Sequence, residues 1–276
     1  MVENLVTCYE ESLRLEEASV LFQVSLLSLG HTVNGMSCMP AIFGCDSESN
    51  GQLRFSEFIW FKSSSLVRQH MVERKLMHYS SLQTILLVGE GNFSFSSALA
   101  TAFKSAKNIV ASSFDSKADK VLRVYDTARS SIENLESRKA LVLYEVDATR
   151  LHEIEDLSAR KFDRIVFNLP HAGYFPGGER SKKAIKKNKE LVSMFLESAA
   201  KLLSLCGEIH VTNKVGPRYK KWNLEEEAEK YGLYLKESVS FQKTDYPGYM
   251  NKRGGGPKIN RTFRLGECRT YMFSAP

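Results

Sequence analysis

The loop at residues 89–94 combines residue types that could bind a nucleotide-like ligand. It interrupts an apolar run at residues 84–88, and apolar residues then recur at helical spacing over residues 95–103. In such a strand–loop–helix unit, glycines let the backbone approach a ligand closely. Glycine also occurs in turns for backbone reasons alone, so the Gly-x-Gly spacing is informative only with its surroundings. The loop residues are Gly89, Glu90, Gly91, Asn92, Phe93 and Ser94.

The residues around the two glycines favour S-adenosylmethionine over a dinucleotide. The dinucleotide fingerprint has a third glycine where Ser94 stands, so the loop is an imperfect cradle for a pyrophosphate. S-adenosylmethionine has no phosphate and carries a sulfonium cation, which the Glu90 carboxylate would favour electrostatically. Asp115, at the end of the next predicted strand, would bind the ribose hydroxyls. A nicotinamide enzyme is the alternative within the same fold.

Polar side chains also follow the next three predicted strands, at residues 108–113, 140–146 and 162–167. These side chains are Asp115, Asp147 and Asn168. In an open α/β sheet, ligands bind outside the carboxyl ends of the strands, so we expect the three residues to meet the residue 89–94 loop at one crevice. Taken singly, each of them could instead be a helix cap.

The motif Asn168-Leu169-Pro170-His171 could bind a nucleobase and act on it. An asparagine amide can donate to or accept from a base edge, and Pro170 could lie against a base face. His171, with a pKa near neutrality, could accept a proton. The alternative is that His171 only braces its loop.

Strand and helix patterns alternate from Ser81 to the end of the chain, which is typical of a doubly wound α/β sheet. Capping-box patterns at Ser116 and Asn223 predict the starts of two helices, and an apolar face from Ile185 to Cys206 predicts another. Further strands are predicted at residues 208–212, 233–241 and 269–273, the last inserting antiparallel at the sheet edge. We therefore predict a Rossmann-like, seven-stranded sheet of the S-adenosylmethionine methyltransferase type for residues 81–276, after a linker at residues 63–80.

Residues 1–62 form a separate segment that we expect to be helical. Within it, residues 46–57 resemble the calcium loop of a calmodulin-like EF-hand, with Gly51 at the sharp turn. Arg54 places a cation at the ninth position of that loop, which favours a degenerate, structural hand over a working calcium site. The calcium ligands implied by the resemblance are Asp46, Glu48, Asn50, the carbonyl of Gln52, and Glu57.

Composition bounds the class of protein. The chain has 276 residues, 43% of them hydrophobic, which is enough for a large core. Its longest early apolar stretch, residues 20–29, is interrupted by Gln23 and Ser25, so we expect neither a membrane span nor a signal peptide. The five cysteines show no Cys-x-x-Cys spacing. These features predict an intracellular protein of the cytoplasm or nucleus, without a membrane partner.

Charge is divided unevenly along the chain. Residues 1–60 carry two basic and eight acidic side chains, net −6, so the formal net charge of +6 leaves +12 for the remainder. A basic domain of this kind predicts a polyanionic partner, and Tyr246 and Tyr249 among the last basic residues suggest stacking on single-stranded RNA. A solvated surface is the alternative for the lysines at residues 182–189. The predicted RNA contacts are Lys214, Tyr249, Asn251, Lys252 and Arg253.

Four motifs together resemble a known family, the eukaryotic large-subunit ribosomal RNA (uridine-N3)-methyltransferase-like proteins, which are common in plants. The motifs occupy residues 86–96, 146–149, 162–173 and 245–254, and the resemblance spans residues 81–273. It implies an S-adenosylmethionine-dependent enzyme that methylates N3 of uridine in ribosomal RNA, with a nucleolar location. Asn92 and Leu169 depart from the family pattern, in which Asp and Phe or Pro are usual.

The reaction that the resemblance implies requires access to the target base, and a protein without enzymatic activity is the alternative. N3 of uridine lies on the pairing edge, so the target base must be single-stranded or flipped out of a helix. The alternative is a non-catalytic, calcium-responsive or RNA-binding adaptor that retains a methyltransferase-like fold.

Overall fold

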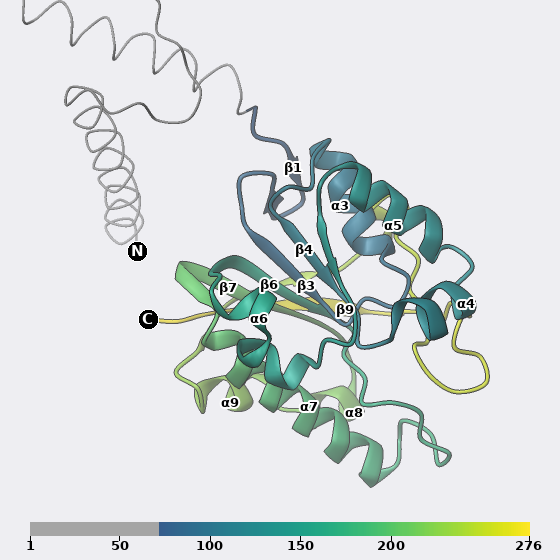
Figure 1. Cartoon of the computed structure of the whole chain (residues 1–276). Helices are drawn as coiled ribbons and strands as arrows, with labels where there is room; N and C mark the ends of the chain where they lie inside the picture. The colour runs from purple at the N-terminus through teal and green to yellow at the C-terminus, as the bar shows by residue number, and fades with distance from the viewer. Residues whose placement is uncertain (1–71) are drawn as a thin grey trace, which may run out of the picture. The chain divides into compact units, whose positions relative to one another are not determined.

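A seven-stranded sheet forms the centre of the computed structural model, which describes residues 72–276 (Figure 1). The strand order is β5-β4-β3-β6-β7-β9-β8, and the first five strands in this order run parallel. This confirms the predicted Rossmann-like α/β sheet. The strands are β3 (Ile85–Val88), β4 (Ile109–Ser112), β5 (Leu141–Leu143), β6 (Phe162–Asn168), β7 (Leu203–Lys214), β8 (Tyr234–Ser240) and β9 (Cys268–Ser274).

The last strand lies inside the sheet, which corrects the prediction that it would occupy an edge. β9 pairs antiparallel with β7 on one side and with β8 on the other. Insertion between two strands satisfies the backbone hydrogen-bonding groups on both sides of β9, and it leaves β8 as the edge strand. The antiparallel direction itself is as predicted.

Helices cover both faces of the sheet. In Figure 1, α3 (Ser94–Phe103) and α5 (Ala128–Ser137) lie on one face, while α6 (Glu155–Ser158), α7 (Lys182–Ala200) and α9 (Leu224–Glu229) lie on the other. Each layer of helices buries its own apolar cluster against the sheet. All four residues of β3 are therefore buried, as expected of a parallel strand covered on both faces.

Three local predictions differ from the structure. The helix expected after Asp115 is broken into a π-helical turn (Lys117–Val121), α4 (Leu122–Val124) and α5, because the buried Tyr125 between them has an extended backbone. Ser116 and Asn223 precede helices, but neither side chain makes a capping hydrogen bond. The helix expected to reach Cys206 ends at Ala200, since the chain then enters β7 and pairs with β6.

The folded unit starts earlier than predicted. It begins at Val72, and a hairpin of β1 (Lys75–Leu76) and β2 (Tyr79–Ser80) occupies part of the expected linker at residues 63–80. Tyr79 is only 1% exposed, so this hairpin packs on the sheet and does not act as a tether. The EF-hand-like loop, with Asp46, Glu48, Asn50, Gln52 and Glu57, lies outside the described residues.

Residues 72–276 contain neither a candidate metal site nor a membrane-spanning helix. Over that part of the chain there is no cluster of histidine, cysteine or carboxylate side chains that could hold a metal ion. Among the helices described there, none combines the length and apolar character needed to cross a membrane.

A buried polar network joins the hairpin to the sheet. Neutral His210 on β7 is fully buried; its Nε2–H donates to Glu208 Oε2 over 2.9 Å, and its Nδ1 accepts from the Tyr79 hydroxyl over 3.2 Å. Burial lowers the pKa of His210, which keeps the ring neutral. Lys236 Nζ donates to Glu208 Oε1 over 2.7 Å, and Arg164 Nε lies 3.4 Å from Oε2.

Glu208 should therefore make stability depend on pH. Burial alone would raise the pKa of its carboxyl, but hydrogen bonds from His210 and Lys236 and the charge of Arg164 lower it from 4.5 to about 2. Because the folded pKa lies below the unfolded one, the stabilisation is complete above pH 4.5 and is lost as the pH falls toward 2.

We predict that Glu208→Gln lowers the free energy of unfolding at pH 7 by about 1–3 kcal/mol. The difference from the wild type should shrink below pH 4.5, and urea denaturation at several pH values measures it. Glu237→Gln, at an exposed site on the edge strand β8, is the control. A difference that is independent of pH would contradict this account.

Candidate active site at the carboxyl ends of the strands

Asn168, the last residue of β6, has a buried side-chain amide with unused hydrogen-bonding capacity. Neither its Nδ2 nor its Oδ1 has a hydrogen-bond partner within the described residues. Buried amides are almost always paired, so an unpaired one indicates a partner that is absent from the protein chain. Asn168 is therefore a candidate ligand-binding residue.

The backbone turns sharply directly after Asn168. Leu169 has φ +54°, a left-handed conformation that costs energy for a residue with a side chain, and its N–H donates to Thr212 O on β7 over 2.8 Å. Phe93 after β3 and Glu145 after β5 are also left-handed. Such conformations cluster at ligand sites, and here they follow three strands at the same end of the sheet.

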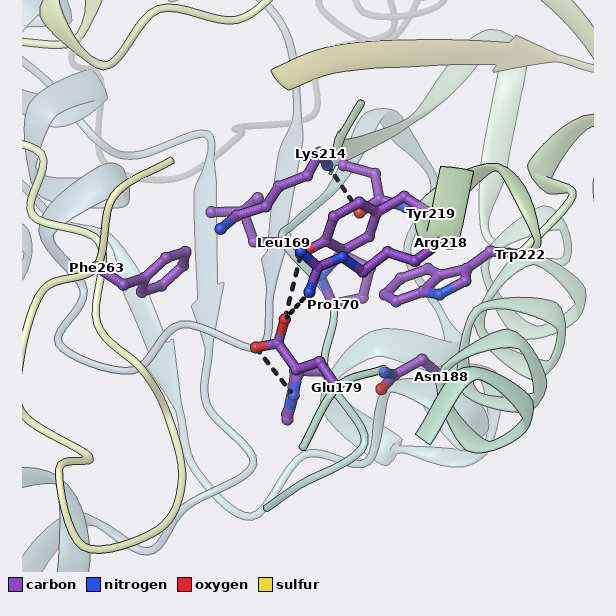
Figure 2. Close-up of a pocket in the computed structure, with 11 residues that line it drawn as sticks. Leu169, Pro170, Glu179, Asn188, Lys214, Arg218, Tyr219, Trp222 and Phe263 are labelled. Atoms are coloured by element: carbon purple, nitrogen blue, oxygen red, sulfur yellow. Dashed lines mark hydrogen bonds and ion pairs between the residues drawn. The ribbon is translucent and has the colours of Figure 1, made fainter. Parts of the chain in front are cut away.

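Two adjoining cavities open beside Leu169 and His171. The larger has a volume of about 790 Å³, and the smaller, shown in Figure 2, also has Pro170 and Trp222 in its wall. Neither wall includes the residue 89–94 loop, Asp115 or Asp147. Residues shared by both cavities are Leu169, His171, Glu179, Lys214, Arg218 and Phe263.

Glu179 is central to the smaller cavity (Figure 2). Its Oε2 accepts from the Tyr219 hydroxyl over 3.2 Å and lies 3.8 Å from Arg218, while its Oε1 lies 3.9 Å from His171 Nε2. Opposite, Lys214 Nζ lies 4.6 Å from the centre of the Phe263 ring and donates to Arg264 O. The cavity therefore combines apolar rings with charged groups of both signs.

Gly89 and Gly91 of the residue 89–94 loop each stand where a side chain would meet a neighbouring ring, but the two rings differ. Gly89 has φ +68°, and a Cβ there would lie 2.4 Å from Phe167 Cε2 on the adjacent strand β6. A Cβ at Gly91 would lie 3.3 Å from the Tyr125 ring. The loop thus runs close against its neighbours, and at Gly89 only glycine avoids both strain and overlap.

The Glu90 carboxyl is partly buried and has no cationic partner among the described residues. Burial raises its pKa to about 7, although the Ser96 N–H donates to Oε2 over 3.3 Å. A positively charged ligand beside Glu90 would favour the ionised form and lower this pKa. The chemistry of the loop therefore suits a cation such as a sulfonium.

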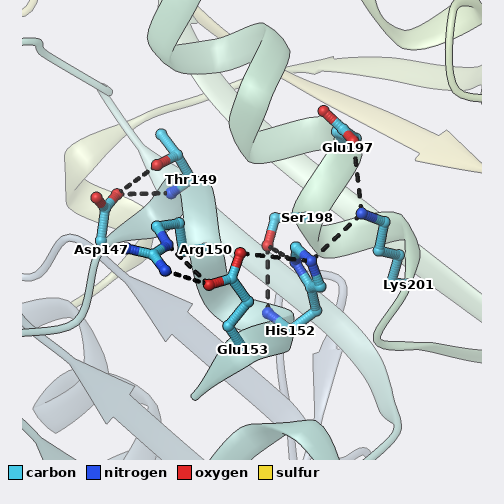
Figure 3. Close-up of polar contacts among 8 residues, drawn as sticks. All are labelled: Asp147, Thr149, Arg150, His152, Glu153, Glu197, Ser198 and Lys201. Carbon is cyan, nitrogen blue, oxygen red and sulfur yellow. Dashed lines mark hydrogen bonds and ion pairs between the residues drawn. The ribbon is translucent and has the colours of Figure 1, made fainter.

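Asp115 and Asp147 lie at strand ends as predicted, and both already have partners in the protein. Asp115 Oδ1 lies 2.6 Å from Lys120 Nζ. Asp147 Oδ1 accepts from the N–H and hydroxyl of Thr149 and so caps a 3-10 helix, Ala148–Glu153 (Figure 3). Asp147 Oδ2 makes no hydrogen bond within the described residues. A helix-cap role therefore explains Oδ1 of Asp147 but leaves Oδ2 able to accept from a ligand.

The loop after β8 is tied directly to the residue 89–94 loop. The Ser94 hydroxyl accepts from Met250 N–H over 2.9 Å and donates to Asn92 Oδ1 over 2.9 Å. Lys252 Nζ donates to Asp126 and Asn260. The Ser94–Met250 and Lys252–Asp126 bonds each join residues more than a hundred positions apart in sequence, so no local motif predicts these contacts.

Several predicted RNA contacts are buried, which changes their interpretation. The Tyr246 and Tyr249 rings are 3% and 9% exposed and pack against Phe95 and Phe241, so they offer no stacking surface here. Asn251 is also buried, and its amide donates to Phe263 O. The ammonium of Lys252 is committed to Asp126 and Asn260. Arg253 remains exposed, and Lys214 lines both cavities.

Sequence reasoning missed four residues of the cavity walls. Glu179 lies in a polar, glycine-containing stretch without a recognisable motif. Tyr219, Trp222 and Phe263 stand among or beside basic residues that suggest RNA contacts, but the three aromatic residues had no role of their own. Their sequence positions give no sign that they meet, since four separate segments contribute to the wall.

Comparison with a family model identifies the family. The model described as "BMT5-like: rRNA (uridine-N3-)-methyltransferase BTM5-like" matches residues 86–253, more than half of the chain. The chain belongs to the BMT5-like family. The matched range includes the residue 89–94 loop, Asp115, Asp147 and the Asn168-Leu169-Pro170-His171 motif.

Individual relatives of this BMT5-like chain differ in length and name. Heavy metal-associated isoprenylated plant protein 41 of Arabidopsis thaliana is 52% identical over 71% of this chain but only 38% of its own length. Uncharacterized protein At4g26485 of the same plant is 45% identical over 73% of this chain and 97% of its own length. The 25S rRNA (uridine(2634)-N(3))-methyltransferase of Saccharomyces cerevisiae is 22% identical, covering 75% of this chain and 76% of the yeast protein.

Solved structures give a more distant likeness. NSun6 from Pyrococcus horikoshii aligns with a TM-score of 0.45 and 18% identity over 70% of this chain and 47% of its own. A TehB-like SAM-dependent methyltransferase from Corynebacterium glutamicum aligns with a TM-score of 0.42 and 15% identity, covering 82% of this chain and 100% of its own. The strand order, and not these likenesses, identifies the fold of the BMT5-like chain.

Ser94 gives a direct test of the connection between the two loops. We predict that Ser94→Ala raises hydrogen exchange at the Met250 amide and lowers the free energy of unfolding by about 1 kcal/mol, because one hydroxyl serves both loops. Exchange followed by mass spectrometry measures the first effect. Ser130→Ala, which removes an exposed hydroxyl on α5 that bonds only within its own turn, is the control. Unchanged exchange at Met250 would show that the loops are not coupled through Ser94.

Proposed function

We propose that this BMT5-like protein is an S-adenosylmethionine-dependent methyltransferase that methylates N3 of uridine in ribosomal RNA. The observation that carries the proposal is the place of the Asn168-Leu169-Pro170-His171 motif. The motif begins at the end of the central strand β6, directly after Phe167, whose ring packs against Gly89. Leu169 and His171 of the motif line a cavity of about 790 Å³. The family membership and the description of its model support the same reaction.

The residues present fit the proposed cofactor. Asn168 has an unpaired buried amide, Gly89 allows close backbone approach, and Glu90 is a partly buried carboxyl without a cationic partner among the described residues. When bound, S-adenosylmethionine supplies a methyl group on a sulfonium, whose carbon–sulfur bond breaks with its electron pair left on sulfur. The residues proposed to hold it are Gly89, Glu90, Gly91, Asn92, Phe93, Ser94, Asp115, Asp147 and Asn168.

The larger cavity suits a base that has left its stack. Cationic side chains surround it and could contact the RNA backbone, while Phe175 and Phe263 line it and could contact a base. In this proposal Lys214 and Arg253 contact RNA, and Tyr249, Asn251 and Lys252 hold the loop that presents Arg253. The cationic side chains of the wall are Arg180, Lys214, Arg218, Lys252, Arg253, Lys258 and Arg264.

Asn168, Pro170 and His171 are the proposed catalytic residues. Asn168 would position the base and the cofactor relative to each other, and Pro170, in the wall of the adjoining smaller cavity, would support the base from that side. Burial lowers the pKa of His171, although the charge of Glu179 opposes this, so the ring is neutral at pH 7.

The reaction can be tested by transfer of labelled methyl to RNA. We expect the purified protein to label ribosomal RNA, and nucleoside digestion to place the label in 3-methyluridine. Label in protein, in a small metabolite or on ribose would contradict the substrate assignment. Binding of S-adenosylmethionine without any transfer would favour the non-catalytic RNA-binding adaptor instead.

Cofactor binding can be tested separately at Asp115. We predict that Asp115→Ala weakens S-adenosylmethionine binding by about 1.5–3 kcal/mol, because a hydrogen bond from a ribose hydroxyl to a carboxylate is lost. Isothermal titration calorimetry measures the affinity. Lys120→Met removes the cation that now pairs with Asp115 and should leave binding equal or tighter. Equal affinity for the wild type and Asp115→Ala would exclude Asp115 from the cofactor site.

A further inference from the structure

The two ring nitrogens of His171 have different surroundings. The Gly173 N–H donates to His171 Nδ1 over 3.2 Å. A peptide N–H cannot exchange roles with its acceptor, so Nδ1 must present its lone pair to Gly173. In the neutral ring the proton is therefore on Nε2, which fixes the tautomer.

The Nε2–H group is available to a ligand. Its nearest charged neighbour, Glu179 Oε1, is 3.9 Å away, which is too far for a hydrogen bond, and no other partner occurs among the described residues. His171 lines both cavities. The opposite carboxylate oxygen of Glu179 is already engaged by Tyr219 and faces Arg218, which holds Glu179 at this distance.

The same geometry leaves His171 without a free basic nitrogen. Nδ1 is occupied by Gly173 N–H, and Nε2 already carries a proton. To accept a proton, the ring would have to give up the Gly173 hydrogen bond and change its tautomer, or rotate while packed edge-on against Phe175, with ring centres 6.0 Å apart. A role as general base therefore requires a rearrangement, whereas a role as donor does not.

We infer that His171 acts as a hydrogen-bond donor, through Nε2–H, to a carbonyl oxygen beside N3 of the target uracil. This rests on the proposed function. When the N3–H bond breaks, the proton passes to water in the open cavity and the electron pair stays on the base, where N3, O2 and O4 share it. A fixed neutral donor stabilises the charge that develops on oxygen, as in other oxyanion sites. Glu179 is a positioning residue for the ring.

The tautomer can be measured without turnover. In protein labelled with ¹⁵N-histidine, we expect the His171 signals to show a protonated Nε2 and an unprotonated Nδ1 at pH 7.5, with the His171→Gln spectrum providing the assignment. The chain has six histidines, so the spectrum is tractable. A protonated Nδ1 would overturn the inference even if the protein methylates uridine as proposed.

Kinetics of two variants separate a donor from a base. Without a donor, His171→Ala should have a kcat on the order of a hundredfold below that of the wild type. Glutamine retains an N–H donor but cannot accept a proton, so the kcat of His171→Gln should be at least about ten times that of His171→Ala. Equal loss in both variants would support the general base and overturn the donor. His152→Gln, at a histidine that lines neither cavity, is the control. Absence of wild-type methylation would defeat the proposed function, while the tautomer measurement would still decide the role of His171.

Discussion

The contact between Gly89 and Phe167 is the constraint on which the candidate site depends. β3 pairs in parallel with both β4 and β6, so the chain leaving β3 must turn in the narrow space above its neighbours. At Gly89 that space is filled by the Phe167 ring, 2.4 Å from where a Cβ would lie. One residue without a side chain thus allows the residue 89–94 loop and Asn168 to lie side by side at the end of the sheet.

The rest of the site is held in place by segments far apart in the sequence. Ser94 hydrogen-bonds to Met250, and the aromatic rings around Phe95 bury the loop that follows β8. Tyrosine is well suited to this role because its ring contributes a large apolar area to the core. The result is that the loop bearing Arg253 is fixed against the loop proposed to bind the cofactor.

Three glutamates show how neighbours decide the behaviour of one residue type. Glu208 is buried but receives hydrogen bonds from His210 and Lys236, and its pKa is lowered to about 2. Glu90 has no cationic neighbour among the described residues, and burial raises its pKa to about 7. Glu179 engages Tyr219 and Arg218 at the cavity and faces the His171 ring. The first stabilises the fold, and the other two belong to the proposed site.

The sequence by itself determined the parallel sheet, the glycine loop and the polar strand ends, because continuous apolar runs and the residues that break them are local signals. It did not determine where β9 inserts, the break at Tyr125 or the burial of Tyr246 and Tyr249, since these depend on which surfaces meet. Glu179 and the tautomer of His171 likewise became visible only in the tertiary structure. A hydrogen bond from Gly173 or an ion pair with Arg218 is fixed by distances in space, and residue order alone does not contain those distances.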